Sequence, residues 1–233
     1  MARAPLFLIA GGRGSVRSRG ADPLVAEAIA RAGVPRPRVA YLGAASDDNP
    51  ALRSLASDML KKAGAAAVVP APLHGKRADP EMARKVLSDS DLVFVSEGDV
   101  DEGMRVLRRA RMTAFLRTLH RAGKPFFGVS AGSIMLARRW VRWRNPGDNA
   151  SAELFPCLGL APVLCDTHGE SEEWEELRTL LLLSPVGALG YGIASGTALI
   201  LEPDGSVSSR GGEVARFRRR TTGVFQVEGL RPD

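Results

Sequence analysis

An acidic or amide residue followed by proline occurs three times in the first hundred residues of the chain, each time at a predicted helix start. Asp22-Pro23, Asn49-Pro50 and Asp79-Pro80 each stand immediately before a helical pattern. Asp and Asn are favoured as N-caps, and proline fits the first helical position because its missing N–H would have no partner there. The segments around these helices contain the short apolar runs 4–10, 37–42, 65–70 and 91–95. Apolar strands that alternate with helices predict an α/β fold, in which an open, mostly parallel sheet carries helices on both faces.

The second half of the chain continues this pattern less regularly. The helix after residue 130 is expected to extend through 138–140, and the Pro/Gly-interrupted segment 142–160 is expected to be a long loop. There is no internal repeat and no low-complexity linker, so we expect a single domain over residues 1–233, with β-hairpin additions at the C-terminus. The other expected elements are helices at 99–110 and 113–122, strands at 162–166, 189–194 and 197–202, and edge hairpin strands at 214–217 and 224–227.

Composition restricts the compartment and the partners. The chain has 233 residues, 45% hydrophobic and 25% charged, which suits a full core. The net charge of +6 comes from arginines spread over many segments, which favours solvated arginine faces over a nucleic-acid partner. Cys157 and Cys165 have neither metal-site spacing nor a disulfide framework, which fits a reducing cytosol. The apolar run 6–10 is shorter than a secretory signal requires, and no run reaches membrane-spanning length. We therefore expect a cytoplasmic protein with no membrane segment, metal or cofactor.

The segment Gly128-Val129-Ser130-Ala131-Gly132 carries the strongest indication of chemistry. It continues an apolar run and precedes a helical pattern. A Gly-x-Ser-x-Gly sequence between a strand and a helix is typical of a nucleophile elbow, a sharp turn that lifts the serine hydroxyl above the sheet edge. The N-terminus of the following helix has unpaired N–H groups that can stabilise an oxyanion. The alternative is that Ser130 only caps this helix.

A serine nucleophile requires a base, and the chain has three histidines. His74 falls in a turn and His120 in a helix, where surface or packing roles are the rule. His168 directly follows a predicted strand and precedes a helix. Because the carboxyl ends of parallel strands gather in one crevice, His168 is the best candidate base for Ser130.

The sequence resembles the serine peptidases typified by dipeptidase E and cyanophycinase, which have the flavodoxin-like fold of class I glutamine amidotransferases. The resemblance extends from Leu42-Gly43-Ala44-Ala45-Ser46 to Gly196-Thr197-Ala198-Leu199. It is most specific at 128–132, at Asp166-Thr167-His168 and at 193–198.

This resemblance implies a role for each matched residue. Ser130 would be the nucleophile and His168 the base. The backbone N–H groups of Ala131 and Gly98 would form the oxyanion site. Glutamine amidotransfer itself is not expected, because those enzymes have cysteine where this chain has Ser130.

Two segments depart from the family pattern. Ser96-Glu97-Gly98 replaces a glycine-rich loop, and Ala194-Ser195 stands where the family supplies the glutamate of the triad. Neutralising the acid of a Ser-His-Asp triad costs about 10⁴-fold in turnover, on the order of 5.5 kcal/mol. The hydroxyl of Ser195 can orient an imidazole but cannot stabilise imidazolium as a carboxylate does. The carboxylates that could replace the missing acid are Asp166, Glu170, Glu172 and Asp148.

Two hypotheses follow from these residues. The first is a serine hydrolase that cleaves a small peptide or amide through an acyl-enzyme on Ser130, weakened by the loss of the acid at Ser195. The second is an impaired or inactive family member that binds a ligand or partner. Relatives select acidic side chains, whereas the segment after His168 is itself acidic, so their specificity does not carry over. Whether the chain forms a homodimer stays open. Cationic recognition could come from Arg13, Arg17, Arg142 or Arg144.

Overall fold

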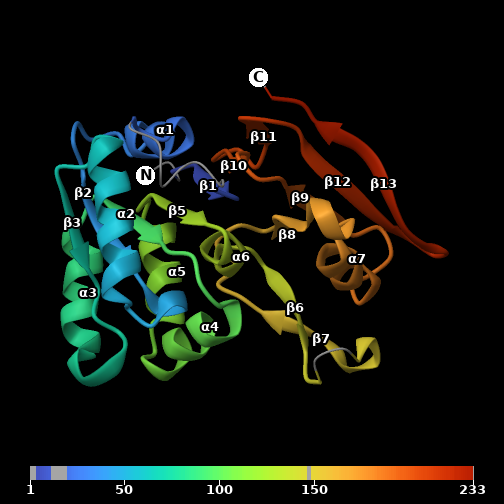
Figure 1. Cartoon of the computed structure of the whole chain (residues 1–233), viewed down its shortest axis with the longest axis horizontal. Helices are drawn as coiled ribbons and strands as arrows, with labels where there is room; N and C mark the ends of the chain where they lie inside the picture. Colours follow the sequence, from blue (N-terminus) through green and yellow to red (C-terminus); the bar gives the residue numbers. More distant parts are fainter. Residues whose placement is uncertain (1–3, 12–19, 146–147, 233) are drawn as a thin grey trace.

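A seven-stranded sheet organises the larger part of the molecule (Figure 1). The computed structural model describes residues 4–11, 20–145 and 148–232. The strands of this sheet are β1 (Leu6–Ile9), β2 (Arg38–Leu42), β3 (Ala67–Pro70), β4 (Leu92–Val95), β5 (Phe126–Val129), β10 (Ala198–Leu201) and β11 (Val207–Arg210). Their order is β11-β10-β1-β5-β4-β2-β3, and only the β1–β10 and β10–β11 pairs are antiparallel. Read from the opposite edge, the parallel strands lie in the order β3-β2-β4-β5-β1. If β2, β3, β4, β5 and β1 are numbered 1 to 5, this is the 2-1-3-4-5 order of a flavodoxin-like sheet.

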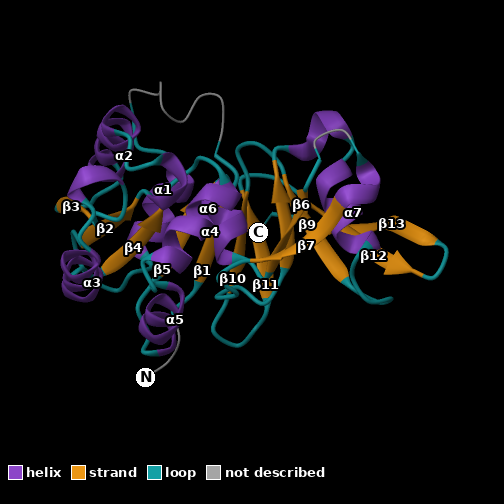
Figure 2. Cartoon of the chain, turned by 90° about the horizontal axis from the view of Figure 1, so that it is seen from below, coloured by secondary structure: helices purple, strands orange, loops and turns teal. Residues whose placement is uncertain are grey.

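Helices cover both faces of this sheet, as the sequence predicts. Phe7 and Ile9 of β1 belong to the core cluster that contains α1 and α2, whereas Leu6 and Leu8 belong to the cluster that contains α3, α4 and α5. Figure 2 shows α2 on one side of the strands and α3 and α5 on the other. A strand buried on both faces is the expected property of a central parallel strand. The helices are α1 (Pro23–Ala30), α2 (Pro50–Lys62), α3 (Pro80–Asp89), α4 (Val100–Arg109) and α5 (Thr113–Arg121).

The three predicted helix caps are confirmed. The side chains of Asp22, Asn49 and Asp79 each accept hydrogen bonds from two N–H groups of the first helical turn. A proline follows each cap at the start of the helix. These local bonds fix where α1, α2 and α3 begin, and therefore where the preceding loops end.

A second sheet has the order β13-β12-β9-β8, with strands β8 (Leu164–Thr167), β9 (Leu189–Ile193), β12 (Val214–Arg220) and β13 (Gly223–Leu230). The predicted C-terminal hairpin is β12–β13, and it pairs with β9. Helix α7 (Glu175–Leu182) packs Leu177 and Leu181 into the same cluster as Phe217 of β12. The chain crosses from this sheet to the larger one within residues 194–197. The sequence does not reveal that crossing, because β9 and β10 both read as short buried strands and their residues do not specify which sheet each one joins.

The expectation of a helix through 138–140 and a loop over 142–160 is wrong for residues 139–143 and 152–156, which are strands, and residues 146–147 of that segment lie outside the described residues. Helix α6 (Ala131–Leu136) ends early, and the chain forms an antiparallel pair of strands, β6 (Arg139–Trp143) and β7 (Ala152–Pro156). Trp140 packs edge-on against Phe155, with 6.0 Å between the ring centroids, and Val141 is fully buried. Aromatic and β-branched side chains pack well across paired strands, and this packing outweighs the helical continuation.

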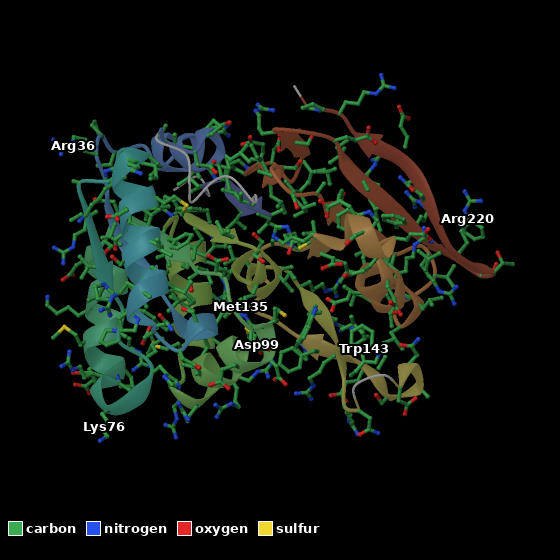
Figure 3. The ribbon with its side chains drawn as sticks, in the orientation of Figure 1. Arg36, Lys76, Asp99, Met135, Trp143 and Arg220 are labelled. Carbon is green, nitrogen blue, oxygen red and sulfur yellow. The ribbon has the colours of Figure 1, made fainter. Side chains whose placement is uncertain are left out.

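The surface and the two cysteines agree with a well-packed fold. Arg36, Lys76 and Arg220 point outward at its edges (Figure 3). Cys157 and Cys165 are both free and buried, and burial raises the pKa of the Cys157 thiol to about 12. Within residues 4–11, 20–145 and 148–232, no helix is long and apolar enough to cross a membrane.

Candidate active site

The backbone of Ser130 is strained, as a nucleophile elbow requires. Ser130 stands between β5 and α6 with φ 52° and ψ −121°. Side-chain-bearing residues avoid such conformations, which cost about 1–3 kcal/mol. The Ser130 N–H donates to the carbonyl oxygen of Ile9 at 2.9 Å, and the Ser133 hydroxyl donates to the same oxygen at 2.9 Å. Strand β1 therefore holds the turn in place through these two hydrogen bonds.

The two glycines of the motif are required by close backbone packing. A Cβ atom on Gly128 would lie 2.5 Å from the backbone of Gly132, and one on Gly132 would lie 2.2 Å from the carbonyl oxygen of Val95. Glycine lets α6 approach both β5 and the end of β4. The strand–turn–helix geometry predicted from the sequence is confirmed, and the role of Ser130 stays a prediction.

The two predicted oxyanion donors lie in one cavity with Ser130. This smaller cavity has a volume of about 340 Å³ and is lined by Ser130, Ala131, Gly98 and His168 among others. Ala131 is the first residue of α6, so its N–H has no acceptor within the helix. Gly98 has φ +143°, and a Cβ atom there would lie 1.9 Å from the carbonyl oxygen of Ala45. Only glycine fits this loop.

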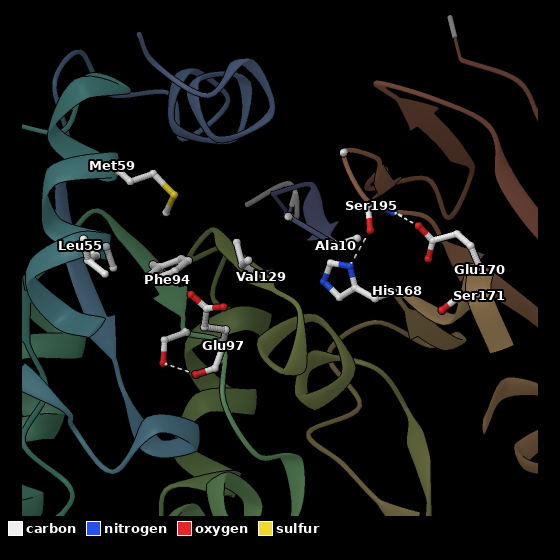
Figure 4. Close-up of a pocket in the computed structure, with 14 residues that line it drawn as sticks. Ala10, Leu55, Met59, Phe94, Glu97, Val129, His168, Glu170, Ser171 and Ser195 are labelled. Atoms are coloured by element: carbon white, nitrogen blue, oxygen red, sulfur yellow. Dashed lines mark hydrogen bonds between the residues drawn. The ribbon is translucent and has the colours of Figure 1, made fainter. Parts of the chain in front are cut away.

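The two substitutions in the Gly98 loop are accommodated away from Gly98. The Ser96 hydroxyl is within 3.2 Å of the Ser46 hydroxyl, inside the protein. Glu97 lines a larger neighbouring cavity of about 790 Å³, where it faces the apolar side chains of Met59 and Phe94 (Figure 4).

His168 lies at the junction of the two cavities and lines both. It follows β8 in a left-handed conformation, with φ 63°, and its N–H donates to the Ile193 carbonyl at 3.2 Å. Its ring nitrogen Nδ1 lies 2.9 Å from Oγ of Ser195, in the crossing between the two sheets (Figure 4). The structure therefore brings together Ser130, His168 and Ser195, the three residues that the sequence indicates for this site.

The other two histidines lie elsewhere. His120 is buried and packs edge-on against Phe126, at 5.9 Å between centroids. His74 could join Asp47 and Glu102 around a cation, since one ligand atom of each lies within 4.8 Å of the others. However, both carboxylate oxygens of Glu102 accept hydrogen bonds from Arg105, and this group lines neither cavity.

The four candidate replacements for the triad acid differ in which groups they contact. Oε1 of Glu170 accepts the Ser195 N–H at 2.7 Å. Asp166 and Glu172 line the smaller cavity, and Oδ1 of Asp166 accepts the Thr167 N–H at 2.8 Å. Asp148 caps a turn between β6 and β7 by accepting the Ala150 N–H, and it lines neither cavity. Only Glu170 reaches the partner of His168.

The cavity around Ser130 is acidic. Burial, and then the charge of Glu176, raise the pKa of Asp166 to about 7 despite its bond from Thr167. Burial also raises the pKa of Glu176. The Trp140 indole N–H, which donates to Oε2 of Glu176 at 3.1 Å, lowers this pKa but does not outweigh burial. Glu176 cannot be recognised as a cavity residue from the sequence, because its place depends on the left-handed residues Glu173 and Trp174 that redirect the chain into α7.

Of the four arginines considered for substrate recognition, the structure describes Arg142 and Arg144, and both form ion pairs outside these cavities. Arg142 pairs with Asp101 and with Glu153, and Arg144 pairs with Glu153. Neither arginine lines a cavity. Arg13 and Arg17 lie outside the described residues.

Comparison with known proteins identifies the family. The model of Peptidase family S51 matches residues 6–208. The chain belongs to peptidase family S51. It is 31% identical over 146 residues to peptidase E of Streptomyces coelicolor, which covers 58% of each protein. It is 30% identical over 138 residues to peptidase E of Shewanella amazonensis, which covers 55% of this chain and 57% of that protein. The matches thus span a little over half the length of these curated relatives.

Solved structures show the same fold. A peptidase from an acI-B1 Actinobacterium superposes with a TM-score of 0.69 at 15% identity, over 99% of this chain and 97% of that one. A putative peptidase E from Listeria monocytogenes EGD-e superposes with a TM-score of 0.65 at 16% identity, over 90% of this chain and 99% of that one. These two structures therefore share the fold of this chain over at least 90% of its length, at low sequence identity.

The strain at Ser130 in this S51 protein predicts an unusual order of stability. Ser130→Gly should be more stable than Ser130→Ala by about 1 kcal/mol, because both lose the hydroxyl but only glycine relieves the strain. Urea unfolding measures the difference. At Ser208, in the extended strand β11, the matched control pair should show the opposite order. Equal stability of the two Ser130 variants would show that the turn is unstrained.

The raised pKa of Asp166 predicts that the S51 protein loses stability as pH rises. The carboxyl titrates near 3.8 in the unfolded chain and near 7 in the folded protein. Between these values the folded state holds a proton that the unfolded chain has released, so stability falls through this interval and levels off above it. Relative to Asp166→Asn, the wild type should lose on the order of 2–4 kcal/mol between pH 4 and pH 8, measured by urea unfolding. Parallel pH profiles of the two proteins would contradict this assignment.

Proposed function

We propose that this S51 protein is a serine-type peptidase that cleaves a small peptide or amide through an acyl-enzyme on Ser130. The strained Ser130, at the N-terminus of α6 and in one cavity with His168, is the observation that carries the proposal. The two relatives named peptidase E support a peptide substrate. The free, buried Cys157 and Cys165 support a cytoplasmic location.

The proposed reaction uses groups that line the smaller cavity. Nε2 of His168 takes the proton of Ser130 as Oγ attacks the substrate carbonyl carbon. The Ala131 and Gly98 N–H groups stabilise the oxyanion. His168 then protonates the leaving amine, and a water molecule hydrolyses the ester on Ser130. The described side chains of Ser130 and His168 do not form a hydrogen bond in the free protein, and such bonds often tighten only with substrate bound.

The charge around the cavities supports a preference among substrates. Of the described residues, the acidic ones that line the two cavities outnumber the single basic one, His168. The acids are Glu97, Asp99, Asp166, Glu170, Glu172 and Glu176. A carboxylate on the substrate would be repelled here, whereas an ammonium or guanidinium group would be attracted. We therefore propose that neutral or basic side chains are preferred to acidic ones.

The second candidate function is a binding protein with an impaired catalytic site. The observation that favours it is the exposed hydroxyl of Ser195, which occupies the position beside His168 where the family pattern has a carboxylate. A preserved cavity without turnover would fit this alternative.

A fluorophosphonate probe separates the two functions. The wild type should be labelled at Ser130, and Ser130→Ala and His168→Ala should lose labelling by at least about 100-fold, because the nucleophile or its base is absent. Intact-protein mass spectrometry and peptide mapping measure the adduct. His120→Ala would perturb the core, so His74→Ala is the better control and should label normally. Equal labelling of the wild type and Ser130→Ala would remove the serine mechanism.

A dipeptide panel tests the substrate preference. Dipeptides with arginine or lysine at the scissile residue should have kcat/KM values about tenfold above those with aspartate or glutamate, because substrate charge meets the cavity carboxylates. The preference should shrink at high salt and in Glu172→Gln. Faster cleavage of acidic dipeptides would contradict the electrostatic assignment while leaving the serine mechanism intact.

A further inference from the structure

Ser195 links the ring of His168 to the carboxylate of Glu170, through its side chain on one side and its backbone N–H on the other. Nδ1 of His168 lies 2.9 Å from Oγ of Ser195, and the Ser195 N–H donates to Oε1 of Glu170 at 2.7 Å (Figure 4). The close-up shows the Glu170 carboxylate on the far side of Ser195 from the imidazole. This is the side on which a triad acid has to stand relative to the base.

Strand pairing brings these three residues together. Strands β8 and β9 are parallel neighbours in which Thr167 pairs with Ile193, so the residues that follow them are adjacent. His168 turns the chain into the 3-10 segment η4 (Gly169–Glu172), which returns Glu170 toward the start of the β9–β10 crossing. Gly169 permits this turn, since a Cβ atom there would lie 2.8 Å from the Trp174 ring and 3.1 Å from Oδ2 of Asp166. The convergence is thus built into the backbone.

Electrostatics select Glu170 among the neighbouring acids. Burial raises the pKa of Glu170, but hydrogen bonds from the Ser195 N–H, from its own N–H and from the Ser195 hydroxyl, together with the charge of His168, outweigh burial and lower the pKa overall. The pKa values of Asp166 and Glu176 are raised instead, mainly by burial. Of these three carboxyl groups, only the one in contact with Ser195 has a lowered pKa, which favours its anionic form.

We propose that Glu170 is a positioning residue that supplies, through Ser195, the negative charge that the family pattern places directly beside the catalytic histidine. The Ser195 hydroxyl has one hydrogen. When it donates that hydrogen to Glu170, its oxygen accepts Nδ1–H of His168, which leaves Nε2 unprotonated to accept the proton of Ser130. The contact fixes both the tautomer and the ring orientation. This inference rests on the proposed function, because it concerns how His168 works as a base.

A purely structural role for Glu170 is the competing explanation, since its carboxylate also holds the Ser195 backbone in the crossing. Glu170→Gln distinguishes the two roles. The amide oxygen of glutamine can still accept the Ser195 N–H, whereas the negative charge is lost. Glu175→Gln is the matched control, because it makes the same charge change on an exposed residue of α7 that lines neither cavity.

The kinetic test uses the best substrate of the dipeptide panel. Glu170→Gln should lower kcat about tenfold with little change in KM, less than the loss of a directly bonded triad acid, while Glu175→Gln should match the wild type. The double variant Ser195→Ala/Glu170→Gln should be no slower than Ser195→Ala alone, because the charge acts through the hydroxyl. Ser195→Glu should restore turnover in the Glu170→Gln background, by placing a carboxylate directly at the ring.

The pH profile adds a measurement that a structural role would not change. Besides Glu170, the described groups facing the His168 region are Asp166, Glu172 and Glu176 from the same part of the chain, with Glu97 and Asp99 from the end of β4. All of these are unchanged in Glu170→Gln. Imidazolium loses one neighbouring negative charge in this variant, so the acid limb of the kcat/KM profile should move to lower pH. NMR signals of the His168 ring, followed against pH, should move the same way without depending on turnover.

The outcomes separate this inference from the proposed function. An active wild type in which Glu170→Gln and Glu175→Gln have equal kcat and equal acid limbs overturns the role of Glu170 and leaves the serine mechanism in place. A loss of kcat in Glu170→Gln with an unchanged acid limb and no rescue by Ser195→Glu assigns Glu170 a structural role only. A wild type that neither hydrolyses a dipeptide nor labels at Ser130 refutes the proposed function itself.

Discussion

The carbonyl oxygen of Ile9 accepts two hydrogen bonds, one from the Ser130 N–H and one from the Ser133 hydroxyl. These bonds tie the end of β1 to both sides of the elbow and hold Ser130 in a backbone conformation that serine avoids. Gly128 and Gly132 make the arrangement possible, since any side chain there would collide with backbone. The position of the hydroxyl, the free N–H of Ala131 and the orientation of α6 all depend on this contact.

The second sheet determines what faces the elbow. His168 and Ser195 follow two parallel strands of that sheet, and the crossing after Ser195 returns the chain to β10 beside β1. The bonds Ala10 N–H to Thr197 and Gly196 N–H to Gly11 join the crossing to the end of β1. The base is therefore positioned against the same strand that holds the nucleophile. A change in either sheet would alter their separation, which is why two sheets rather than one define the site.

Much of this fold could be predicted from local sequence, and the reasons are local. The caps at Asp22, Asn49 and Asp79 are satisfied within one helical turn, so they act wherever the rest of the chain lies. Local sequence does not predict the strands at 139–143 and 152–156, because they are stabilised by Trp140 and Phe155 meeting across the pair, a contact between residues 15 positions apart. Glu176 could not be assigned to the cavity, because the two left-handed residues before α7 decide which way that helix faces.

The sequence by itself determined the αβ alternation, the glycine-flanked serine and the absence of a carboxylate at Ser195, since each is a property of residue type and spacing. The tertiary structure alone decided which of four nearby acids reaches the partner of His168. Asp166, Glu172 and Asp148 also carry carboxyl groups, but of these four residues only Glu170 is returned by the chain to within hydrogen-bonding distance of Ser195. The sequence shows which acidic residues lie near the base along the chain. Strand register and turn geometry decide which one is within hydrogen-bonding distance.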